Sequence, residues 1–361
     1  MWFASIFSTV LAGIVALFPV RHLGLPRWAE IFLGLLLVTM AQRYFAVRLF
    51  RTPVLAPEAM PPPLVLFFLW GEIFLLLAAL LTLPWGVARL CGAPLGGAWP
   101  LALAAALGSW MLWMGFRQPP VREHEVVLPG LPEAAEGMRV AVLADLHLDP
   151  FRNRAWAERL VARTNALKPD LVLLTGDQSD GMLEARRGDL EALAGLRAPL
   201  GVYAISGNHE WFFDQEALMD FHERLGIHVL DGRTAQAGAL WLVGLPDCKS
   251  LTSSDNGPLL RRLMGDLPPG AFPVVLVHKP GIAAEADALG ARLQLSGHTH
   301  GGQFPGLATL IARRNAGLVR GWYGFPGGLK VFVAPGSGVW SGWPYRLYGS
   351  ELSLLVLRGQ R

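Results

Sequence analysis

The sequence predicts two regions of different fold class: an all-α transmembrane domain over residues 1–118 and an α/β domain over residues 119–361. The first observation is the composition. Of the 361 residues, 52% are hydrophobic and only 16% are charged, whereas a soluble domain has about a quarter charged residues. The second observation is that short apolar runs alternate with helical segments from Met138 onward. This alternation is typical of a buried sheet covered by helices.

Four apolar runs in the first region have the length of membrane-spanning helices. They cover residues 2–20, 28–50, 64–83 and 98–116, and a turn is expected at 84–97. Each run approaches the ~20 residues that cross a ~30 Å hydrocarbon core. We therefore predict four transmembrane helices, joined by loops. A cleaved signal peptide is the alternative for the first run, but that run lacks a basic start and a small-residue cleavage site.

Arginines near the ends of these helices predict the orientation, because positive residues favour the cytoplasmic side. With the N-terminus inside, the inner loops hold five arginines and the outer loops three. The inner set is Arg43, Arg48, Arg51, Arg117 and Arg122, and the outer set is Arg21, Arg27 and Arg89. We therefore expect a cytoplasmic α/β domain, on the inner membrane in a bacterium. One miscounted helix would reverse this orientation.

One acidic residue, Glu72, lies in the middle of the third apolar run. Ionisable residues at that depth are costly and often functional. A single acid without charged neighbours favours a neutral side chain that hydrogen-bonds to Trp70, Thr82 or another helix, and an ion path is the alternative.

Charge and cysteine content exclude some classes of protein. The formal net charge is +3, and the sequence contains no run of Lys and Arg residues that could bind along a polyanion. Nucleic-acid binding is therefore not expected. Two cysteines, Cys91 and Cys248, form no CxxC motif. They fall in different regions, so we expect no structural disulfide. The two cysteines do not decide whether the protein resides in an oxidising or a reducing compartment.

Five strand-like runs of the α/β domain end in side chains that can bind metal. Their ends are Asp145-Leu-His147, Gly176-Asp177, Gly207-Asn208-His209-Glu210, His278 and Gly297-His298-Thr299-His300. Residues i and i+2 of an extended chain point to one side, so His298 and His300 present two imidazoles to one space. Open α/β sheets place their sites at the carboxyl ends of strands. Ordinary polar turns explain one or two such ends but not five, so the sequence predicts a metal centre.

This ordered set of motifs resembles that of the calcineurin-like metallophosphoesterases. The resemblance covers about residues 121–361 and includes Gly301-Gly302-Gln303 and Gly336-Ser-Gly-Val-Trp340, which are typical of a membrane-anchored branch. It implies the family fold, a sandwich of two packed sheets flanked by helices. In this domain we expect helices at 156–167, 184–196 and 215–225, and a first strand at 121–128.

The resemblance also assigns the ligands of two divalent metal ions. Asp177 would bridge the ions. Asp145, His147 and His300 would complete one site, and Asn208, His278 and His298 the other. These donors suit Mn²⁺, Fe or Zn²⁺. His209 is expected to stabilise transition-state charge or to protonate the leaving oxygen, and Glu210 to orient the ring of His209. The alternative for these last two is that they only fill a turn.

The glycine-rich insert from Gln303 to Gly328 follows the His-Thr-His motif directly. Its arginines, Arg313, Arg314 and Arg320, could bind a phosphate, and its apolar residues could contact lipid; a solvated basic loop is the alternative. The remaining histidines, His22, His124, His222 and His228, are expected at surfaces or interfaces.

The implied function is hydrolysis of a phosphodiester or pyrophosphate bond by a water activated by two metals. A lipid or lipid-linked substrate at the membrane bilayer is favoured, because a soluble substrate needs no four-helix anchor. A soluble substrate is the first alternative. A transporter or sensor with a phosphate-binding domain is the second, and a degenerate ligand set would favour it. A phosphoprotein phosphatase is a third alternative without a supporting feature.

Overall fold

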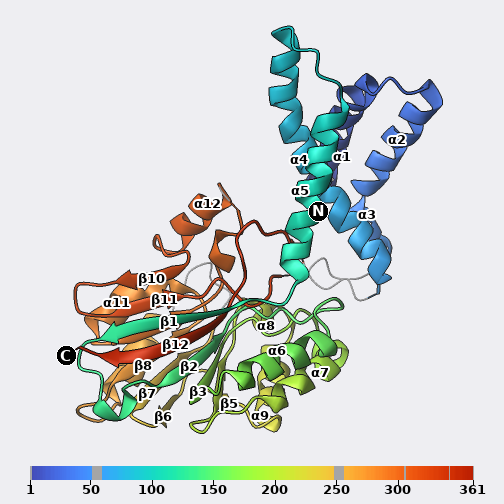
Figure 1. The fold of residues 1–361 in the computed structure, drawn as a ribbon. Coiled ribbons are helices and arrows are strands. Elements are labelled where there is room, and N and C mark those ends of the chain that lie inside the picture. Colours follow the sequence, from blue (N-terminus) through green and yellow to red (C-terminus); the bar gives the residue numbers. More distant parts are fainter. Residues whose placement is uncertain (1, 51–58, 248–255, 305, 341, 361) are drawn as a thin grey trace. The chain divides into compact units, whose positions relative to one another are not determined.

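The computed structural model describes residues 2–50, 59–247, 256–304, 306–340 and 342–360. Contacts divide the chain into a helical unit, residues 1–115 with 342–345, and a sandwich unit, residues 116–341 with 346–361 (Figure 1). The short segment Gly342–Tyr345 thus belongs to the helical unit although it lies near the end of the chain, which the sequence did not indicate. The boundary predicted between residues 118 and 119 stays a prediction. Arg51 and Cys248 lie outside the described residues.

The helical unit contains five α-helices in its described part. They are α1 (Trp2–Leu17), α2 (Arg27–Met40), α3 (Arg43–Leu49), α4 (Pro62–Leu90) and α5 (Ala98–Phe116), with a short 3₁₀ helix, η1 (Val20–His22). Three segments, 4–22, 62–90 and 98–116, are long and apolar enough to cross a membrane. A fourth span exists only if α2 and α3, bent by 58°, count as one. The predicted number of four therefore stays a prediction.

The turn predicted from residue 84 is wrong over residues 84–90, because α4 continues through Pro84 to Leu90. Proline is tolerated inside apolar helices where neighbouring groups satisfy the backbone. Trp85 and Arg89, in the last turns of α4, donate hydrogen bonds to the carbonyls of Gly96 (3.0 Å) and Leu95 (2.7 Å). These contacts hold the following loop against the helix, so the chain turns only after residue 90.

The surface of the helical unit is apolar. Of the 27 large hydrophobic side chains exposed in the described part of the chain, 21 belong to residues 1–115. The same helices bury a core of small and aliphatic residues, among them Ala12, Val15, Leu75, Ala78 and Ala104. Helices that are apolar both inside and outside the bundle are typical of a membrane domain.

Glu72 has a different partner from those predicted. Its Oε2 accepts a hydrogen bond from Arg43 Nη1 at 2.8 Å, and both side chains are buried. Trp70 instead bonds to Ser109, and Thr82 to the carbonyl of Ala78. Arg43 therefore lies inside the bundle rather than in a loop. It can no longer be counted among the loop arginines from which the orientation was predicted. The orientation therefore stays a prediction.

The sandwich unit is built from two six-stranded sheets. The first has the order β1-β12-β2-β3-β4-β5 and the second β10-β11-β9-β8-β7-β6. The strands of the first sheet are β1 (Val121–Leu128), β2 (Arg139–Leu143), β3 (Leu171–Thr175), β4 (Val202–Ile205), β5 (His228–Val229) and β12 (Leu352–Gly359). Those of the second are β6 (Thr234–Ala237), β7 (Leu240–Leu245), β8 (Pro273–Val277), β9 (Leu293–Ser296), β10 (Gly321–Gly324) and β11 (Lys330–Val333).

Both sheets have a parallel centre: β2 to β5 run parallel, and so do β7, β8, β9 and β11. One core lies between the sheets and joins Val140 and Leu173 of the first to Leu276 and Phe332 of the second. Nearly continuous aliphatic runs suit strands that are buried on both faces. Two sheets packed in this way, with helices outside, confirm the predicted fold class.

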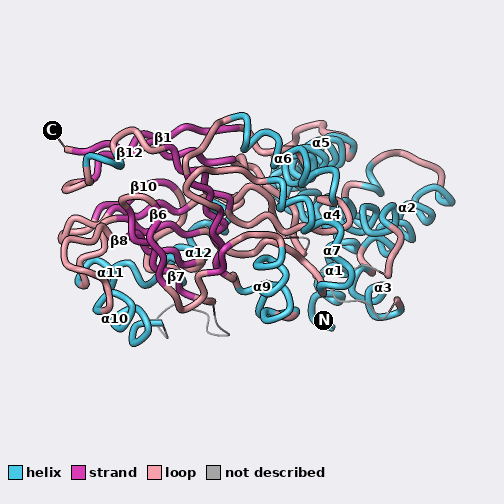
Figure 2. Tube along the Cα trace, turned by 90° about the horizontal axis from the view of Figure 1, so that it is seen from below, coloured by secondary structure: helices cyan, strands magenta, loops and turns pink. Residues whose placement is uncertain are grey.

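Helices cover the outer face of each sheet (Figure 2). The first sheet carries α6 (Arg154–Ala166), α7 (Leu183–Leu190) and α9 (Gln215–Arg224), and the second carries α10 (Gly257–Gly265) and α11 (Ala283–Ala288). Side chains that precede the helices cap them: Asn153 accepts from the Trp156 N–H, and Asp214 from the Ala217 N–H. These caps satisfy backbone donors that would otherwise have no partner.

The remaining elements are short and were not predicted. They are two α-helices, α8 (Asn208–Phe213) and α12 (Leu307–Arg314), and four 3₁₀ helices of the described part: η2 (Glu133–Ala135), η3 (Glu191–Gly195), η5 (Pro280–Ile282) and η6 (His300–Gly302). The glycine-rich insert between Gln303 and Gly328 contains α12 and β10 (Gly321–Gly324). His222 is also not at a surface; it is fully buried, and its Nδ1 lies 2.7 Å from the carbonyl of Leu218.

Candidate metal centre

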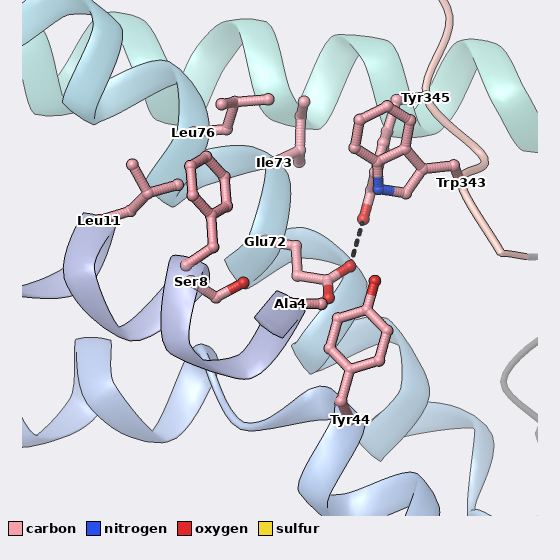
Figure 3. Close-up of a pocket in the computed structure, with 10 residues that line it drawn as sticks. Ala4, Ser8, Leu11, Tyr44, Glu72, Ile73, Leu76, Trp343 and Tyr345 are labelled. Atoms are coloured by element: carbon pink, nitrogen blue, oxygen red, sulfur yellow. Dashed lines mark hydrogen bonds between the residues drawn. The ribbon is translucent and has the colours of Figure 1, made fainter. Parts of the chain in front are cut away.

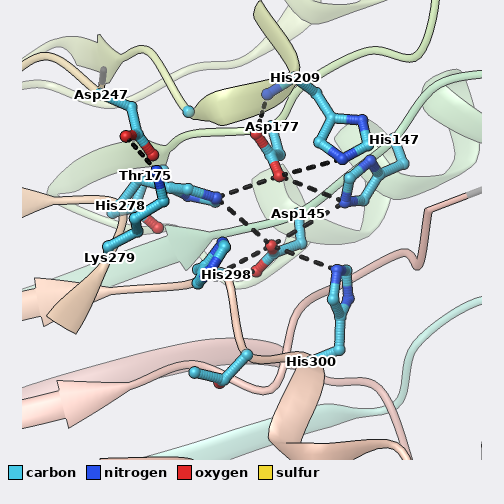
Figure 4. A network of polar contacts seen from close by, with 12 residues as sticks. Asp145, His147, Thr175, Asp177, His209, Asp247, His278, Lys279, His298 and His300 are labelled. Atoms are coloured by element: carbon cyan, nitrogen blue, oxygen red, sulfur yellow. Dashed lines mark hydrogen bonds and ion pairs between the residues drawn. The ribbon is translucent and has the colours of Figure 1, made fainter. Parts of the chain in front are cut away.

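The carboxyl ends of β2, β3, β4, β8 and β9 bring the predicted ligands together (Figure 4). Their ligand atoms form three groups in which all atoms lie within 4.8 Å of one another. These groups are Asp145 with His147 and His300, His147 with Asp177 and His209, and Asp177 with His278 and His298. Six of the seven predicted ligands thus share one cluster, and the seventh, Asn208, follows β4 and begins α8.

Asp177 lies at the centre of this cluster. Its Oδ2 lies 3.0 Å from His278 Nε2, 3.6 Å from His147 Nε2 and 4.0 Å from His209 Nε2. Asp145 Oδ1 lies 3.7 Å from His300 Nε2 and 3.9 Å from His147 Nε2. Asp177 therefore belongs to two of the three groups, which is the position that a bridging ligand needs. The bridging role itself stays a prediction.

The backbone is strained at these residues. Eight non-glycine residues of the described chain have positive φ, and five of them are Asp145, His147, Asp177, His298 and His300. This region of φ is costly for residues with a Cβ and is concentrated at functional sites. The positive φ values mark sharp bends directly after β2, β3 and β9, where these five residues lie.

Two glycines let these bends pack closely. A Cβ on Gly207 would clash with Asp177 Oδ1, and a Cβ on Gly297 would lie 2.5 Å from Asp145 Oδ2. Any side chain at either position would therefore displace a predicted ligand. The glycines that flank the ligands in the sequence are required by this close approach.

Four buried polar atoms of the predicted ligands have no hydrogen-bond partner among the described residues: His147 Nε2, Asn208 Oδ1, His278 Nε2 and His300 Nδ1. Unsatisfied buried polar atoms are rare in folded proteins and call for a specific reason. His147 Nε2 faces the carboxylates of Asp145 and Asp177 at distances too long for a hydrogen bond. A divalent cation between these groups would satisfy all of them, so the residues present fit a metal centre.

Asp180 is a part of the centre that the sequence did not indicate. Its Oδ1 lies 2.8 Å from His147 Nδ1 and 2.6 Å from His209 Nδ1, and it is fully buried. A carboxylate at Nδ1 fixes the orientation of an imidazole and leaves Nε2 directed toward the site. Asp180 therefore orients one predicted ligand and the predicted catalytic histidine together. Its position three residues after Asp177 was the only available signal.

The role predicted for Glu210 needs correction. Its two carboxylate oxygens accept hydrogen bonds from the backbone N–H groups of Asp177, Gln178 and Gly207 at 2.7–2.9 Å. Asp180, not Glu210, contacts the His209 ring. Glu210 instead ties the bend after β3 to the bend after β4. The sequence suggested a contact between chain neighbours, but the helical turn of α8 directs the two side chains apart.

The charges of these side chains shift their ionisation. Burial alone would lower the pKa of His209, but the carboxylates of Asp177 and Asp180 raise it to about 9. Burial likewise opposes ionisation of Asp177, but His278 and His209 outweigh it and lower its pKa well below the usual value. The side chains alone therefore favour a carboxylate at Asp177 and a protonated ring at His209.

Two buried pairs support the ligands from behind. Arg346, fully buried, donates hydrogen bonds to the carbonyls of His300 at 3.0 Å and Gly338 at 2.7 Å, and burial lowers its pKa to about 10. Lys279, beside His278, lies 2.6 Å from Asp247. Neither pair was predicted, because each joins segments that are distant in the sequence.

The three arginines predicted to bind substrate lie at the surface of the insert. Arg313 and Arg314 are exposed at the end of α12. Arg320 is exposed as well, and its guanidinium lies 5.2 Å from the centre of the Tyr348 ring. Of the three, Arg320 is beside the cluster, because a Cβ on Gly301 would lie 3.5 Å from its Cδ. A substrate role for any of them stays a prediction.

Two packed sheets hold this Asp, Asn and His cluster at their strand ends, and its oxygen and nitrogen donors suit divalent metal ions. Residues 138–302 match the family model described as calcineurin-like phosphoesterase. The segment that holds all the predicted ligands thus matches this family, which confirms the resemblance predicted from the motifs. The family match and the ligand groups both indicate a site for divalent metals.

Several known proteins are similar to the chain. A metallophosphoesterase of Caenorhabditis elegans is 30% identical over 69% of this chain and 55% of its own length. A Danio rerio protein named transmembrane protein with metallophosphoesterase domain is 29% identical over 72% of this chain and 62% of its own length. The chain thus spans about half to two thirds of these relatives. A crystal structure of a dimetal phosphatase from Danio rerio has a TM-score of 0.39 and 11% identity over 56% of this chain and 88% of that one.

Proposed function

We propose that this chain is an integral-membrane phosphoesterase that hydrolyses a phosphodiester or pyrophosphate bond in a lipid or lipid-linked substrate. The observation that carries the proposal is the convergence of the Asp, His and Asn side chains at the ends of five strands. The same chain carries helices whose surface is apolar. Together they combine a site for phosphate hydrolysis with a domain suited to lipid.

Two divalent cations fit the ligand groups. Asp145, His147 and His300 would hold one, Asn208, His278 and His298 the other, and Asp177 both. Cations held there supply Lewis-acid polarisation of a phosphoryl oxygen and increase the acidity of water. We propose Mn²⁺, Fe or Zn²⁺, because the donor set contains no thiolate.

His209 is the proposed proton donor to the leaving oxygen. Asp180 Oδ1 lies 2.6 Å from its Nδ1, so Nε2 is directed toward the predicted ligands and lies 4.0 Å from Asp177 Oδ2. Without metal ions, the carboxylates of Asp177 and Asp180 raise the pKa of His209 to about 9, which favours the protonated ring that a proton donor needs. A positioned imidazolium stabilises charge on the phosphoryl oxygens and can release its Nε2 proton as the bond breaks.

Apolar side chains beside His209 support a lipid substrate. Trp211 and Phe212 follow it in α8 and are exposed, although they are large and aromatic. The Phe212 ring lies 5.4 Å from the His209 ring, and the Trp340 ring lies 6.3 Å from it. A soluble phosphoester gains little from such a surface, whereas an acyl or prenyl chain can cover it. Arg320, beside Gly301, could bind a second phosphate group.

We propose a multi-pass membrane location with the sandwich unit on the cytoplasmic side. Three or four apolar helices support the first statement. The second rests on the bias of loop arginines. Cysteine labelling from outside intact cells tests it, and labelling of a cysteine placed at the C-terminus would contradict it.

The test of the function is a hydrolysis screen on the full chain reconstituted with Mn²⁺, Fe²⁺ or Zn²⁺. Substrates are bis-p-nitrophenyl phosphate, p-nitrophenyl phosphate and lipid pyrophosphates. We expect metal-dependent turnover and the highest kcat/KM on a lipid substrate. Activity that survives chelation in a metal-free preparation would refute the metal-dependent reaction. Equal kcat/KM on lipid and soluble diesters would refute the lipid substrate.

Two variants separate lipid binding from chemistry. Phe212→Ala should raise KM for the lipid and spare the chromogenic diester, whereas Val127→Ala, an exposed apolar residue of β1, should change neither. The double change of Arg313 and Arg314 to Ala tests the phosphate contact in the same assay. Equal loss on both substrates would mean that these residues support the fold.

A further inference from the structure

The helical unit contains a pocket of about 330 Å³ (Figure 3). None of its described lining residues is a predicted metal ligand. Residues of α1, α3, α4 and the segment Gly342–Tyr345 line it. Its volume lies at the lower end of the range of small-molecule sites. Leu11, Ile73 and Leu76 form an apolar wall, and Tyr44, Glu72 and Tyr345 form a polar end.

The polar end has one unused acceptor. Glu72 Oε2 accepts from Arg43 Nη1 at 2.8 Å, and the Tyr345 hydroxyl lies 3.4 Å from it while bonding to the Leu69 carbonyl at 2.8 Å. Glu72 Oε1 is buried and has no hydrogen-bond partner in the part of the chain that the structure describes. A buried carboxylate oxygen without a partner is costly. A ligand that donates a hydrogen bond would remove this cost.

The charge of the pocket selects a neutral ligand. Glu72 is the one ionic residue among the described lining residues, and Arg43 already neutralises it. A phosphate would meet no free cation, and it would place a second negative charge beside Glu72. The Tyr44 hydroxyl points toward the same carboxylate (Figure 3) and adds a second polar contact for a small head group.

We propose that this pocket binds a neutral lipid alcohol. Its hydroxyl donates to Glu72 Oε1, and its hydrocarbon chain lies against Leu11, Ile73 and Leu76. The proposal does not depend on the reaction at the metal centre. The alcohol has two possible sources: a lipid alcohol resident in the membrane, or one released by hydrolysis of a phosphorylated lipid.

The direct test is photo-crosslinking of the full chain in detergent micelles with a diazirine derivative of oleyl alcohol. We expect labelled peptides from α1 and α4. Oleyl alcohol should compete at concentrations about tenfold lower than its methyl ether, which cannot donate a hydrogen bond, or oleyl phosphate. Labelling elsewhere in the chain, equal competition by the ether, or stronger competition by the phosphate would overturn the proposal.

A matched pair of variants locates the site independently. Leu76→Trp fills the pocket, whereas Leu80→Trp places the same side chain one turn further along α4, at an exposed position. Labelling should be lost in the first and kept in the second. Equal labelling of both variants would overturn the site. If Leu76→Trp does not fold, the competition series on the unchanged chain decides.

The source of the alcohol is tested by mass spectrometry of lipids that copurify with the chain. Asp177→Ala removes a predicted metal ligand and so should remove hydrolysis. An alcohol that copurifies equally with this variant is resident in the membrane. An alcohol found only with the active chain is a product of its reaction. Absence of any lipid alcohol from both preparations would count against the proposal.

Discussion

The two units of this chain each bury an acidic side chain, and they do so in different ways. Asp177 of the sandwich unit lies among His147, His209 and His278, on a bend with positive φ. Glu72 of the helical unit pairs with a single arginine on an unstrained helix. Several histidine rings around carboxylates on a strained backbone suit a ligand of high charge, such as a divalent cation. An isolated ion pair neutralises itself, so we expect the two sites to respond differently when one partner is removed.

The largest effect should come from Asp177→Ala. This change removes the carboxylate shared by two ligand groups, so we expect turnover to fall to background and both metal ions to be lost. Elemental analysis and the hydrolysis assay measure the two effects. Asp220→Ala, an exposed aspartate of α9, is the control and should match the unchanged chain. A variant that keeps full metal content would contradict the central position of Asp177.

The next effect separates chemistry from metal binding within the sandwich unit. His209→Ala should lower kcat by about 10²–10⁴, the range for a lost proton donor, while metal content stays near that of the unchanged chain. Loss of metal would instead identify His209 as a ligand.

Asp180→Ala should show a mixed result, because Asp180 contacts both His147 and His209. We expect a fall of about 10–100-fold in metal affinity, which is typical when the partner of a ligating histidine is removed, together with a lower kcat at saturating metal. Metal titration followed by activity measures both. If only kcat changes, then the contact with His147 does not matter for metal binding.

The corresponding change in the helical unit should affect stability. Arg43→Met leaves Glu72 buried without its partner and should cost about 3–5 kcal/mol, measured by unfolding in detergent. The double variant Arg43→Met with Glu72→Leu removes both charges and should recover most of this loss. Rescue is expected because the double variant leaves no unpaired charge buried among the helices. Failure of the double variant would mean that the pair also determines how the helices pack.

The sequence predicted those features that depend on neighbouring residues. Each predicted ligand follows an apolar strand within a few positions, so strand and ligand are visible together in one short motif. The outer bounds of β1 and α5 follow from the same local patterns. The resemblance to the family supplied the pairing of distant ligands, which spacing alone could not give.

Features that join distant segments were missed. Arg346 holds the carbonyl of His300, 46 positions away, and Arg43 pairs with Glu72, 29 positions away. An arginine at a helix end resembles a loop arginine until the neighbouring helix is in place. Glu210 was assigned to its chain neighbour His209, although the direction of its side chain depends on the turn of α8. Long-range polar contacts require the tertiary structure.

The smallest effect concerns His222, a buried histidine outside both sites. Burial lowers its pKa, with the contact to the Leu218 carbonyl opposing that shift. The unfolded chain therefore binds a proton at a higher pH than the folded chain does. Stability contributed by the neutral ring is present above the unfolded pKa of about 6.5 and is lost as the pH falls below it, by at most about 1.4 kcal/mol per pH unit.

His222→Phe should flatten the dependence of thermal stability on pH between about 7.5 and 5.5, whereas His228→Phe, at an exposed position, should not. An unchanged slope in His222→Phe would show that other groups govern the acid sensitivity of the sandwich unit.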